Sequence, residues 1–394
     1  MLDKNTSLAA ECPIPLSEFN LSDGKNGPAL SLPAACFTSS EFYDFEFKSV
    51  WEKEWFCIGR ATDIPNAGDY FTVTVGEEPL FAIRDGSGTV HVLTNVCQHR
   101  SMLLLEGHGN TKRIRCPLHS WVYSLEGNLL SAPALNDVDD FDKAGVCLPR
   151  IRSEIWEGFI FIAFDETLAP VSERLANLSK QLANFRISEL AASSPLELTP
   201  YDWDWKIYGD ECYHCTYLHS GTWCNFYPTP ESSIDEGTHL SDPERGIVAY
   251  QLISEVKDGA PTRTGQILHP LLPGLTELER SGLQYVTVLP NLLIVTMSDK
   301  VKYFLWLPRG PQKSSFGVSW LFPRSTREGE KFAEVAAMEK NDLGPVMQED
   351  IFAWSRTQAG LRSRFAPRGR LSPKEKVIAQ FYGWLVDKYR AAAR

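Results

Sequence analysis

The spacing of hydrophobic and polar positions changes from strand-like to helical along the chain. Between about residues 68 and 164 the apolar positions form short alternating or continuous runs, which are interrupted by Gly and Asp turns. Such runs predict β-strands, which we expect at Tyr70–Val75, Leu80–Arg84, Val90–Val96, Trp121–Leu125 and Phe159–Phe164. This segment is therefore predicted to be a small all-β domain.

The pattern becomes helical over residues 172–192, where leucines recur at steps of three and four residues. Further strand-like runs follow at Leu283–Leu289, Leu292–Met297, Tyr303–Leu307 and Phe316–Phe322. Two more helices are predicted, at Gly329–Asn341 and Lys374–Tyr389, and Ser372 is a candidate N-cap for the second. This mixture predicts a larger α+β domain after the β-domain.

The first forty residues are rich in Pro, Ser, Ala and Asn and have weak periodicity, so an extended arm is expected there. A short aromatic helix is predicted at Ser49–Cys57. The chain thus divides into an N-terminal arm (1–45), an all-β domain (46–165) and an α+β domain (166–394). At 394 residues, two domains are the natural expectation.

Charge and composition exclude some classes of protein. The net charge of −11 argues against a nucleic-acid partner, and no apolar run approaches the roughly 20 residues that span a bilayer. The first residues lack a signal-peptide pattern, so a cytoplasmic location is expected. Nine irregularly spaced cysteines favour metal binding or burial over a disulfide framework.

Two Cys–His pairs lie sixteen residues apart, each in a predicted loop: Cys97-Gln98-His99 and Cys116-Pro117-Leu118-His119. Structural zinc usually takes like ligands spaced by two to four residues, which a Cys-X-His pair does not supply. Blue copper would need one Cys and a weak Met ligand. A Rieske [2Fe–2S] cluster needs two thiolates on one iron and two imidazoles on the other, and the two pairs match that requirement.

The stretch from Asn95 through Pro133 resembles the Rieske domain of ring-hydroxylating and demethylating oxygenase α-subunits. Other residues also fit that pattern: Arg100, Pro117, Trp121 and Gly127. The resemblance implies that the cluster ligands are Cys97, His99, Cys116 and His119. Ser101 and Ser120 are departures, since many relatives have Gly there, and either hydroxyl could hydrogen-bond near the cluster and adjust its potential.

A second histidine motif lies downstream, where His214 and His219 follow Glu211. Two histidines and a carboxylate form the facial triad of oxygen-activating mononuclear Fe(II), although a spacing of five needs a helix end or bulge between them. Two unrelated histidines, or a zinc site at Cys212 and Cys215, are alternatives that the residues alone leave open.

The same family resemblance covers this motif and implies specific roles. His214 and His219 would bind the iron, and Glu211 would orient His214 and accept a hydrogen bond from His119 of a neighbouring subunit. Because the two centres within one chain lie too far apart in that family, the resemblance implies a homotrimer or a multiple of one. It also implies a helix-grip catalytic domain, with an antiparallel sheet flanked by helices.

The third iron ligand implied by the resemblance is Asp350, in the segment Gln348-Glu349-Asp350. Glu349 is the neighbouring alternative. One departure from many relatives is the pair Ile207 and Tyr208, where a Glu–Asn pair is frequent. Hydrogen bonding around the iron is therefore expected to differ.

The string Glu-Cys-Tyr-His-Cys at 211–215 resembles the branch that acts on glycine betaine, stachydrine and carnitine. A methylammonium group favours an aromatic cage through cation–π attraction. Candidate cage residues are Trp203, Trp205, Tyr208, Tyr213, Tyr217, Trp223, Phe226 and Tyr227, although any one of them is more often a core residue. Monooxygenation of a quaternary ammonium or methylated amine is preferred, with dioxygenation and hydroxylation of an aromatic or other organic acid as alternatives.

The chemistry needs O₂ as co-substrate and two electrons from outside the chain. No dinucleotide-binding Gly-rich motif is present, so NAD(P)H is expected to act through a separate reductase, perhaps with a ferredoxin. A basic run could attract that partner or be a solvated helix end: Arg356, Arg362, Arg364, Arg368 and Arg370. A Rieske electron carrier without oxygenase activity is the competing class, which the long second domain disfavours.

Overall fold

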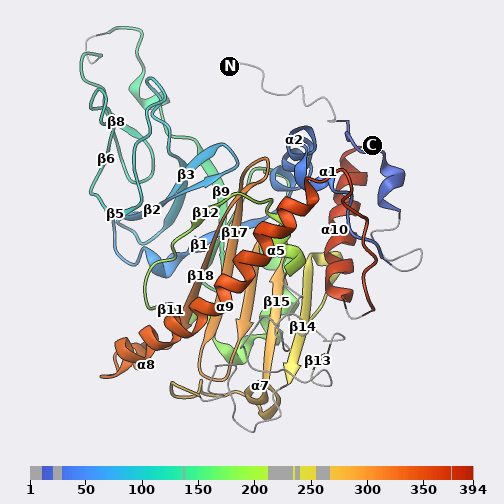
Figure 1. The fold of residues 1–394 in the computed structure, drawn as a ribbon. Coiled ribbons are helices and arrows are strands. Elements are labelled where there is room, and N and C mark those ends of the chain that lie inside the picture. Colours follow the sequence, from blue (N-terminus) through green and yellow to red (C-terminus); the bar gives the residue numbers. More distant parts are fainter. Residues whose placement is uncertain are drawn as a thin grey trace.

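The computed structural model describes residues 11–20, 29–135, 138–211, 234–235, 240–253, 267–373 and 375–393. The α+β prediction is confirmed. Figure 1 shows a small β-domain at the upper left, and beside it a large sheet that is crossed by the long helix α9.

The small domain is built on a seven-stranded antiparallel sheet in the order β1-β10-β9-β4-β3-β2-β5. Its strands are β1 (Phe56–Arg60), β2 (Asp69–Val75), β3 (Glu78–Arg84), β4 (Val90–Thr94), β5 (His108–Asn110), β9 (Arg150–Trp156) and β10 (Phe159–Ala163). Alternation explains β2, where Phe71, Val73 and Val75 are buried and the residues between them are not. The strands predicted near 70–75, 80–84, 90–96 and 159–164 are therefore confirmed.

A three-stranded sheet in the order β6-β7-β8 extends from this domain. It consists of β6 (Ile114–Arg115), β7 (Val122–Tyr123) and β8 (Leu129–Ser131). The predicted strand at 121–125 corresponds to the shorter β7. A buried cluster that includes Leu93, Ile114, Trp121 and Leu148 joins the two sheets. The connecting loops at the end of this unit carry both Cys–His pairs.

The second sheet is antiparallel, in the order β11-β18-β17-β16-β15-β14-β13, with β12 also paired to β18. Its strands are β11 (Ala191–Ala192), β12 (Thr199–Tyr201), β13 (Ile234–Asp235), β14 (Ile247–Ile253), β15 (Gly282–Val288), β16 (Leu292–Thr296), β17 (Val301–Gly310) and β18 (Lys313–Phe322). All five residues of β16 are buried, with Leu293 and Val295 on one face and Leu292 and Ile294 on the other. Both faces of this sheet are therefore covered.

Different helices cover the two faces. One face packs in a core cluster with residues of α5 (Lys206–Glu211), α9 (Phe332–Leu361) and α10 (Lys376–Ala392). The other packs against α3 (Val171–Arg174) and α4 (Ala176–Gln181). The predicted helix over 172–192 is thus broken into short pieces, and Arg186 has a left-handed backbone (φ 48°) between two 3₁₀ turns. No helix in the described ranges is long and apolar enough to span a bilayer.

The C-terminal helices differ in detail from the prediction. Helix α9 extends about twenty residues beyond the predicted end at Asn341. Helix α10 begins at Lys376 with Glu375 at the N-cap position, so Ser372 is not its N-cap. Instead, the Ser372 backbone N–H donates to the Glu375 carboxylate at 2.5 Å.

Two helices lie in the last part of the segment for which an extended arm was predicted. Helices α1 (Ala35–Thr38) and α2 (Ser40–Ser49) precede a 3₁₀ turn at Trp51–Lys53, so the helix predicted at Ser49–Cys57 is misplaced. The ring of Phe42 in α2 lies edge-on to Tyr389 of α10, with 5.2 Å between ring centroids. Packing of aromatic side chains of α2 against the C-terminal helix α10 therefore stabilises α2.

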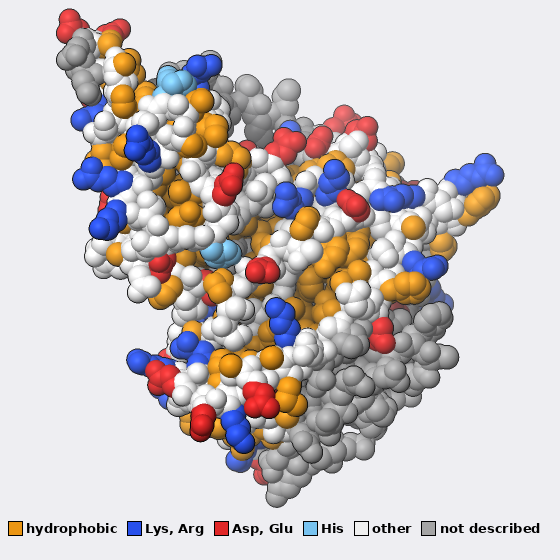
Figure 2. All heavy atoms as spheres, turned by 60° about the vertical axis from the view of Figure 1, so that its left-hand side comes forward, with side chains coloured by type: hydrophobic (Ala, Val, Ile, Leu, Met, Phe, Trp, Pro, Cys, Tyr) orange, Lys and Arg blue, Asp and Glu red, His pale blue; other side chains and the backbone are white. Residues whose placement is uncertain are grey.

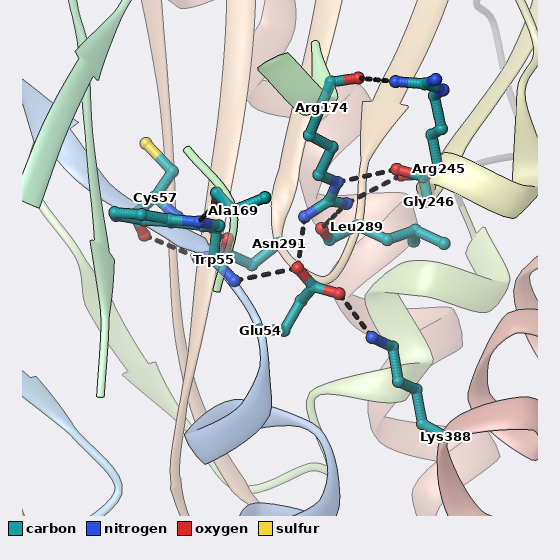
Figure 3. Close-up of polar contacts among 10 residues, drawn as sticks. All are labelled: Glu54, Trp55, Cys57, Ala169, Arg174, Arg245, Gly246, Leu289, Asn291 and Lys388. Carbon is teal, nitrogen blue, oxygen red and sulfur yellow. Dashed lines mark hydrogen bonds and ion pairs between the residues drawn. The ribbon is translucent and has the colours of Figure 1, made fainter. Parts of the chain in front are cut away.

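A polar network joins the two sheets (Figure 3). The Glu54 carboxylate, just before β1, accepts from Arg174 of α3 at 2.6 Å and from Lys388 of α10 at 2.7 Å. Arg174 also donates to the Leu289 carbonyl, in the β15–β16 turn, at 2.8 Å. The Asn291 side chain bonds both backbone groups of Cys57 in β1. The small domain is therefore fixed to the second sheet through side chains and backbone together.

Candidate metal centres

The two Cys–His pairs lie in neighbouring loops at the end of the small domain. Cys97 and Cys116 are buried, whereas His99 and His119 are exposed. The two imidazole rings are adjacent, with 4.7 Å between their centroids and a near-perpendicular arrangement. The structure thus brings together the four residues that the sequence predicted, with the sulfur atoms inside and the imidazoles at the surface.

The two loops repeat the same backbone pattern. The Cys97 N–H donates to the Met102 carbonyl and the Ser101 N–H donates back to the Cys97 carbonyl, at 2.9 and 3.0 Å. In the second loop, the Cys116 N–H donates to Trp121 and the Ser120 N–H donates to Cys116, at 2.8 and 3.1 Å. Because the two loops have matching backbone conformations, each contributes one thiol and one imidazole.

Two aromatic side chains contact this group. The indole of Trp121 stacks on His99 with 4.9 Å between centroids and 7° between planes. The Tyr123 hydroxyl lies 3.3 Å from the Cys97 sulfur and accepts a hydrogen bond from the Gln98 N–H at 3.0 Å. Burial and the Cys97 contact raise the pKa of Tyr123, so this hydroxyl stays protonated. The sequence analysis missed Tyr123, because only the fold places β7 beside Cys97.

The donor set fits a two-iron cluster better than one metal ion. In the described part of the chain, no three His, Cys, Asp or Glu side chains are grouped so that they could hold a single ion. A structural zinc site would need four ligands around one ion. A Rieske cluster instead divides two sulfur and two nitrogen ligands between two irons, which suits paired loops.

The predicted mononuclear site is described only in part. Asp350 is buried in α9, with 8% of its surface exposed, and the neighbouring Glu349 is less buried. Glu211 ends helix α5, but its side chain is outside the described part of the structure. His214, His219, Cys212 and Cys215 lie outside the described residues. Of the three expected iron ligands, Asp350 is therefore the one that lies in the described part of the chain, where it is buried.

An aromatic cluster lies between α5, α9 and the second sheet. Tyr208 of α5 stacks on Phe316 of β18, with 4.6 Å between centroids and 6° between planes. Trp354 of α9, one helical turn after Asp350, meets Tyr208 edge-on at 4.8 Å. Trp306 and Trp203 complete the contacts, at 6.0 Å from Tyr208. The indole N–H groups of Trp203, Trp306 and Trp354 have no hydrogen-bond partner among the described residues.

The predicted cage residues divide into three groups. Trp203 and Tyr208 belong to this aromatic cluster. Trp205 is a structural residue, because its indole N–H donates to Glu46 at 2.8 Å and its ring packs on Trp51. The others lie outside the described residues: Tyr213, Tyr217, Trp223, Phe226 and Tyr227. The sequence analysis missed Trp306, Phe316 and Trp354, although the four-residue step from Asp350 could have indicated Trp354.

Ile207 and Tyr208, where many relatives have Glu and Asn, are both buried. The Tyr208 ring fills the space between Phe316 and Trp306 by stacking on both. At this position of α5 the chain therefore provides apolar and aromatic packing.

Comparison with known proteins agrees with this arrangement. Residues 54–142 match the model of the Rieske [2Fe–2S] domain. Residues 185–391, more than half of the chain, match the model of the ring hydroxylating alpha subunit (catalytic domain). The chain belongs to the ring-hydroxylating oxygenase α-subunit family. It is an iron-dependent Rieske oxygenase, which holds a [2Fe–2S] cluster and a mononuclear iron.

Curated relatives of this oxygenase include two monooxygenases. The chain is 25% identical over 364 residues to the chloroplastic choline monooxygenase of Arabidopsis thaliana, covering 89% of this chain and 81% of that protein. It is 26% identical over 332 residues to the glycine betaine monooxygenase oxygenase subunit of Chromohalobacter salexigens, covering 76% and 72%.

Solved structures support the fold of the oxygenase. A quaternary ammonium Rieske monooxygenase, crystallised in complex with L-carnitine, superposes with a TM-score of 0.75. The match covers 95% of this chain and 99% of that chain, at 21% sequence identity. The two-domain Rieske oxygenase fold is therefore common to both.

Proposed function

We propose that this oxygenase hydroxylates or N-demethylates a small quaternary ammonium or methylated amine as a monooxygenase. The observation that carries the oxygenase assignment is the pair of equivalent loops with buried cysteines and adjacent exposed imidazoles, 4.7 Å apart. In this proposal Cys97, His99, Cys116 and His119 hold the cluster. The iron is held by His214, His219 and Asp350.

The cluster, when bound, supplies single electrons, and the mononuclear iron, when bound, activates O₂. The chain holds the two thiolates in a dry interior and leaves both imidazoles at the surface. A thiolate at Cys97 can only accept, so with the cluster bound the Tyr123 hydroxyl, 3.3 Å from that sulfur, would donate a hydrogen bond and stabilise negative charge there. Glu211 is proposed to orient His214 and to accept from His119 of a neighbouring subunit.

The substrate class is supported by the relatives and by the aromatic cluster beside Asp350. Choline and glycine betaine, named in the relatives, both carry a trimethylammonium group. The faces of Trp, Tyr and Phe attract such cations. Trp203 and Trp354 would supply those faces, with Trp354 one helical turn after Asp350, because the faces of Tyr208 are covered by Phe316 and Trp306. An aromatic or other organic acid is the alternative substrate, and pure electron transfer is the second alternative function.

The assembly and partners are part of the proposal. Three exposed apolar residues, Met102, Leu103 and Leu118, lie in the same two loops as the exposed imidazoles, as expected for a surface that contacts another protein. Figure 2 shows hydrophobic side chains exposed across one face of the molecule, among interspersed charges. A homotrimer that pairs each cluster with a neighbouring iron would use this surface. The six cysteines in the described ranges form no disulfide, which suits a reducing compartment such as the cytoplasm.

A separate reductase, perhaps with a ferredoxin, would supply electrons from NAD(P)H. Two arginines of the basic run form exposed cation–π pairs, Arg356 over Phe352 and Arg364 over Phe365. Arg362 and Arg368 instead hydrogen-bond to Gln312 and Ser31. Arg356 and Arg364 are therefore the stronger docking candidates. Unchanged salt dependence of NADH-driven turnover after both are replaced by Gln would exclude them.

Substrate-dependent oxygen consumption tests the function. The purified protein, supplied with a reductase, would be given choline, glycine betaine, carnitine and benzoate in parallel. We expect oxygen uptake with at least one quaternary ammonium compound and loss of it in His214→Ala, with cluster reduction retained. Turnover of benzoate alone would support the organic-acid alternative. Cluster reduction without uptake on any compound would support the electron carrier.

A further inference from the structure

Helix α9 carries Asp350 but contains a weak point of its own. Gly344 and Pro345 lie in its interior, six and five residues before Asp350. Glycine lowers helix stability and proline has no amide hydrogen to donate, so this stretch holds its shape less firmly than the rest. The position of the carboxylate therefore depends on how the helix is anchored on both sides of that stretch.

On the C-terminal side, the buried Gln358 amide connects α9 to the start of α5. Its carbonyl oxygen accepts from the Asp204 backbone N–H at 2.8 Å. Its amide nitrogen donates to the Phe37 carbonyl and to the Gln312 side chain, each at 3.2 Å. Gln358 is 1% exposed and lies two helical turns after Asp350. This side chain therefore fixes α9 directly to the residues that begin α5.

The start of α5 is in turn fixed by buried charges. The Lys206 ammonium lies 2.7 Å from both the Glu46 and the Asp204 carboxylates. Glu46 also accepts from the Tyr389 hydroxyl, so α2, α5 and α10 meet at one point. All three charged residues are almost fully buried, and removing one partner of such a group leaves an uncompensated charge. The segment at the start of α5 to which Gln358 is bonded is thus itself held in place.

On the N-terminal side, Glu339 anchors α9 to the second sheet. It lies 2.5 Å from the Lys300 ammonium and 3.4 Å from the His269 imidazole. Lys300 also pairs with Asp299 at 3.0 Å, in the turn between β16 and β17. Burial would raise the pKa of Glu339, but the neighbouring His269 imidazole and the charge of Lys300 outweigh it and hold the pKa below its usual range.

We propose that Gln358 and Glu339 are positioning residues, which hold Asp350 at the distance from α5 that iron binding requires. The inference rests on the proposed role of Asp350. Glu339 and Asp350 lie on one face of α9, since a step of eleven residues is close to three whole turns, and Gln358, eight residues further, is turned by about 80° from Asp350 around the helix axis. The two anchors bracket both the weak point and the carboxylate, so loss of either frees one end of the segment that carries Asp350.

Iron affinity tests the proposal without relying on turnover. Protein that keeps its cluster but lacks mononuclear iron would be titrated anaerobically with Fe(II), and the nitric oxide adduct followed by electron paramagnetic resonance. Gln358→Met and Glu339→Gln keep side-chain size and remove hydrogen bonding or charge. We expect each to weaken Fe(II) binding about tenfold and to change the shape of the adduct spectrum, with cluster absorbance unchanged.

Two matched variants on exposed positions of the same helix serve as controls. Gln348→Met and Glu334→Gln repeat the two chemical changes and should leave Fe(II) affinity and the adduct spectrum at wild-type values. If Gln358→Met does not fold, Gln312→Ala removes one partner of Gln358 from a half-buried position and should still weaken binding about threefold. Wild-type affinity and spectrum in the folded anchor variants would overturn the proposal.

Asp350→Asn separates this inference from the proposed function. Loss of Fe(II) binding in Asp350→Asn, together with normal binding in the anchor variants, would reject the positioning role and leave the iron ligand assignment intact. Normal binding in Asp350→Asn would instead reject that assignment, and with it the basis of the positioning role.

Discussion

At the scale of residues, both Cys–His loops contain a serine in a left-handed backbone conformation. Ser101 and Ser120 have φ angles of 57° and 62°. This conformation costs a non-glycine residue roughly 1–2 kcal/mol, which explains why many members of the family have Gly at these positions. The Ser120 hydroxyl accepts a hydrogen bond from Arg115 at 3.0 Å, a contact that glycine could not make. Ser101 and Ser120 thus keep the left-handed backbone conformation of the two loops.

Tyr123→Phe should lower the reduction potential of the cluster. The substitution removes the hydroxyl that contacts the Cys97 sulfur at 3.3 Å, and that contact favours the more negative, reduced state. A differential loss of about 1 kcal/mol corresponds to about 40 mV for one electron. Redox titration followed by visible absorbance measures the shift. Tyr70→Phe, in the same domain, is the control, and an unchanged potential in Tyr123→Phe would contradict the assigned contact.

Asp63→Asn should stabilise the protein above about pH 6. Burial raises the pKa of Asp63 to about 6, from an unfolded value near 4, although the Arg60 charge opposes the shift. The folded state therefore keeps the Asp63 proton up to a higher pH than the unfolded state does. The stability that this proton gives to the folded state is fully present below about pH 4 and is lost as the pH rises through 6. The variant should gain about 2 kcal/mol at pH 7.5 and nothing at pH 4, in urea unfolding. An equal gain at both pH values would contradict this account.

At the scale of elements, the sequence predicted the strands much better than the helices. Strands β15 to β18 are long apolar runs between turns, so local pattern alone locates them. Helices α1 and α2 escaped prediction because Phe37 and Phe42 are buried by contacts with α9 and α10, more than 300 residues away in sequence. The helix over 172–192 was predicted in one piece, because local periodicity does not show the left-handed turn at Arg186.

Glycines in two helices should respond oppositely to alanine. A Cβ at Gly360, in the last turn of α9, would meet no atom within 4 Å, so Gly360→Ala should raise the free energy of unfolding by up to about 1 kcal/mol. A Cβ at Gly209 in α5 would lie 2.3 Å from the Phe381 ring, so Gly209→Ala should lower it by about 1–3 kcal/mol. Chemical denaturation measures both, and a loss of stability in Gly360→Ala would contradict the described packing of α9.

At the scale of the whole molecule, the relation between the small domain and the second sheet depends on buried polar contacts. Glu54 and Arg174 are 9% and 13% exposed at their side chains, so each relies on the other for compensation of its charge. The two Cys–His pairs that the structure brings together could be found in the sequence because each pair is local. The Glu54 network and the aromatic cluster were not, because each draws residues from segments more than a hundred positions apart.

Glu54→Gln should destabilise the whole protein. It leaves the buried Arg174 and the partly buried Lys388 without their carboxylate, which costs about 3–5 kcal/mol for a buried pair. The control is Glu189→Gln, which breaks an exposed pair with Arg186 and should change stability by less than about 1 kcal/mol. Equal effects of the two variants in thermal unfolding would show that the Glu54 network does not hold the domains together.

Iron and sulfide analysis of the purified protein tests the central claim most directly. Two centres in one chain require about three irons and two acid-labile sulfides per chain, with loss of one iron and no sulfide in the His214→Ala, His219→Ala double variant. Cys97→Ser should instead remove the sulfide and the visible chromophore. A wild-type ratio of one iron per sulfide, unchanged in the double histidine variant, would contradict the second iron centre. Absence of labile sulfide would contradict the first.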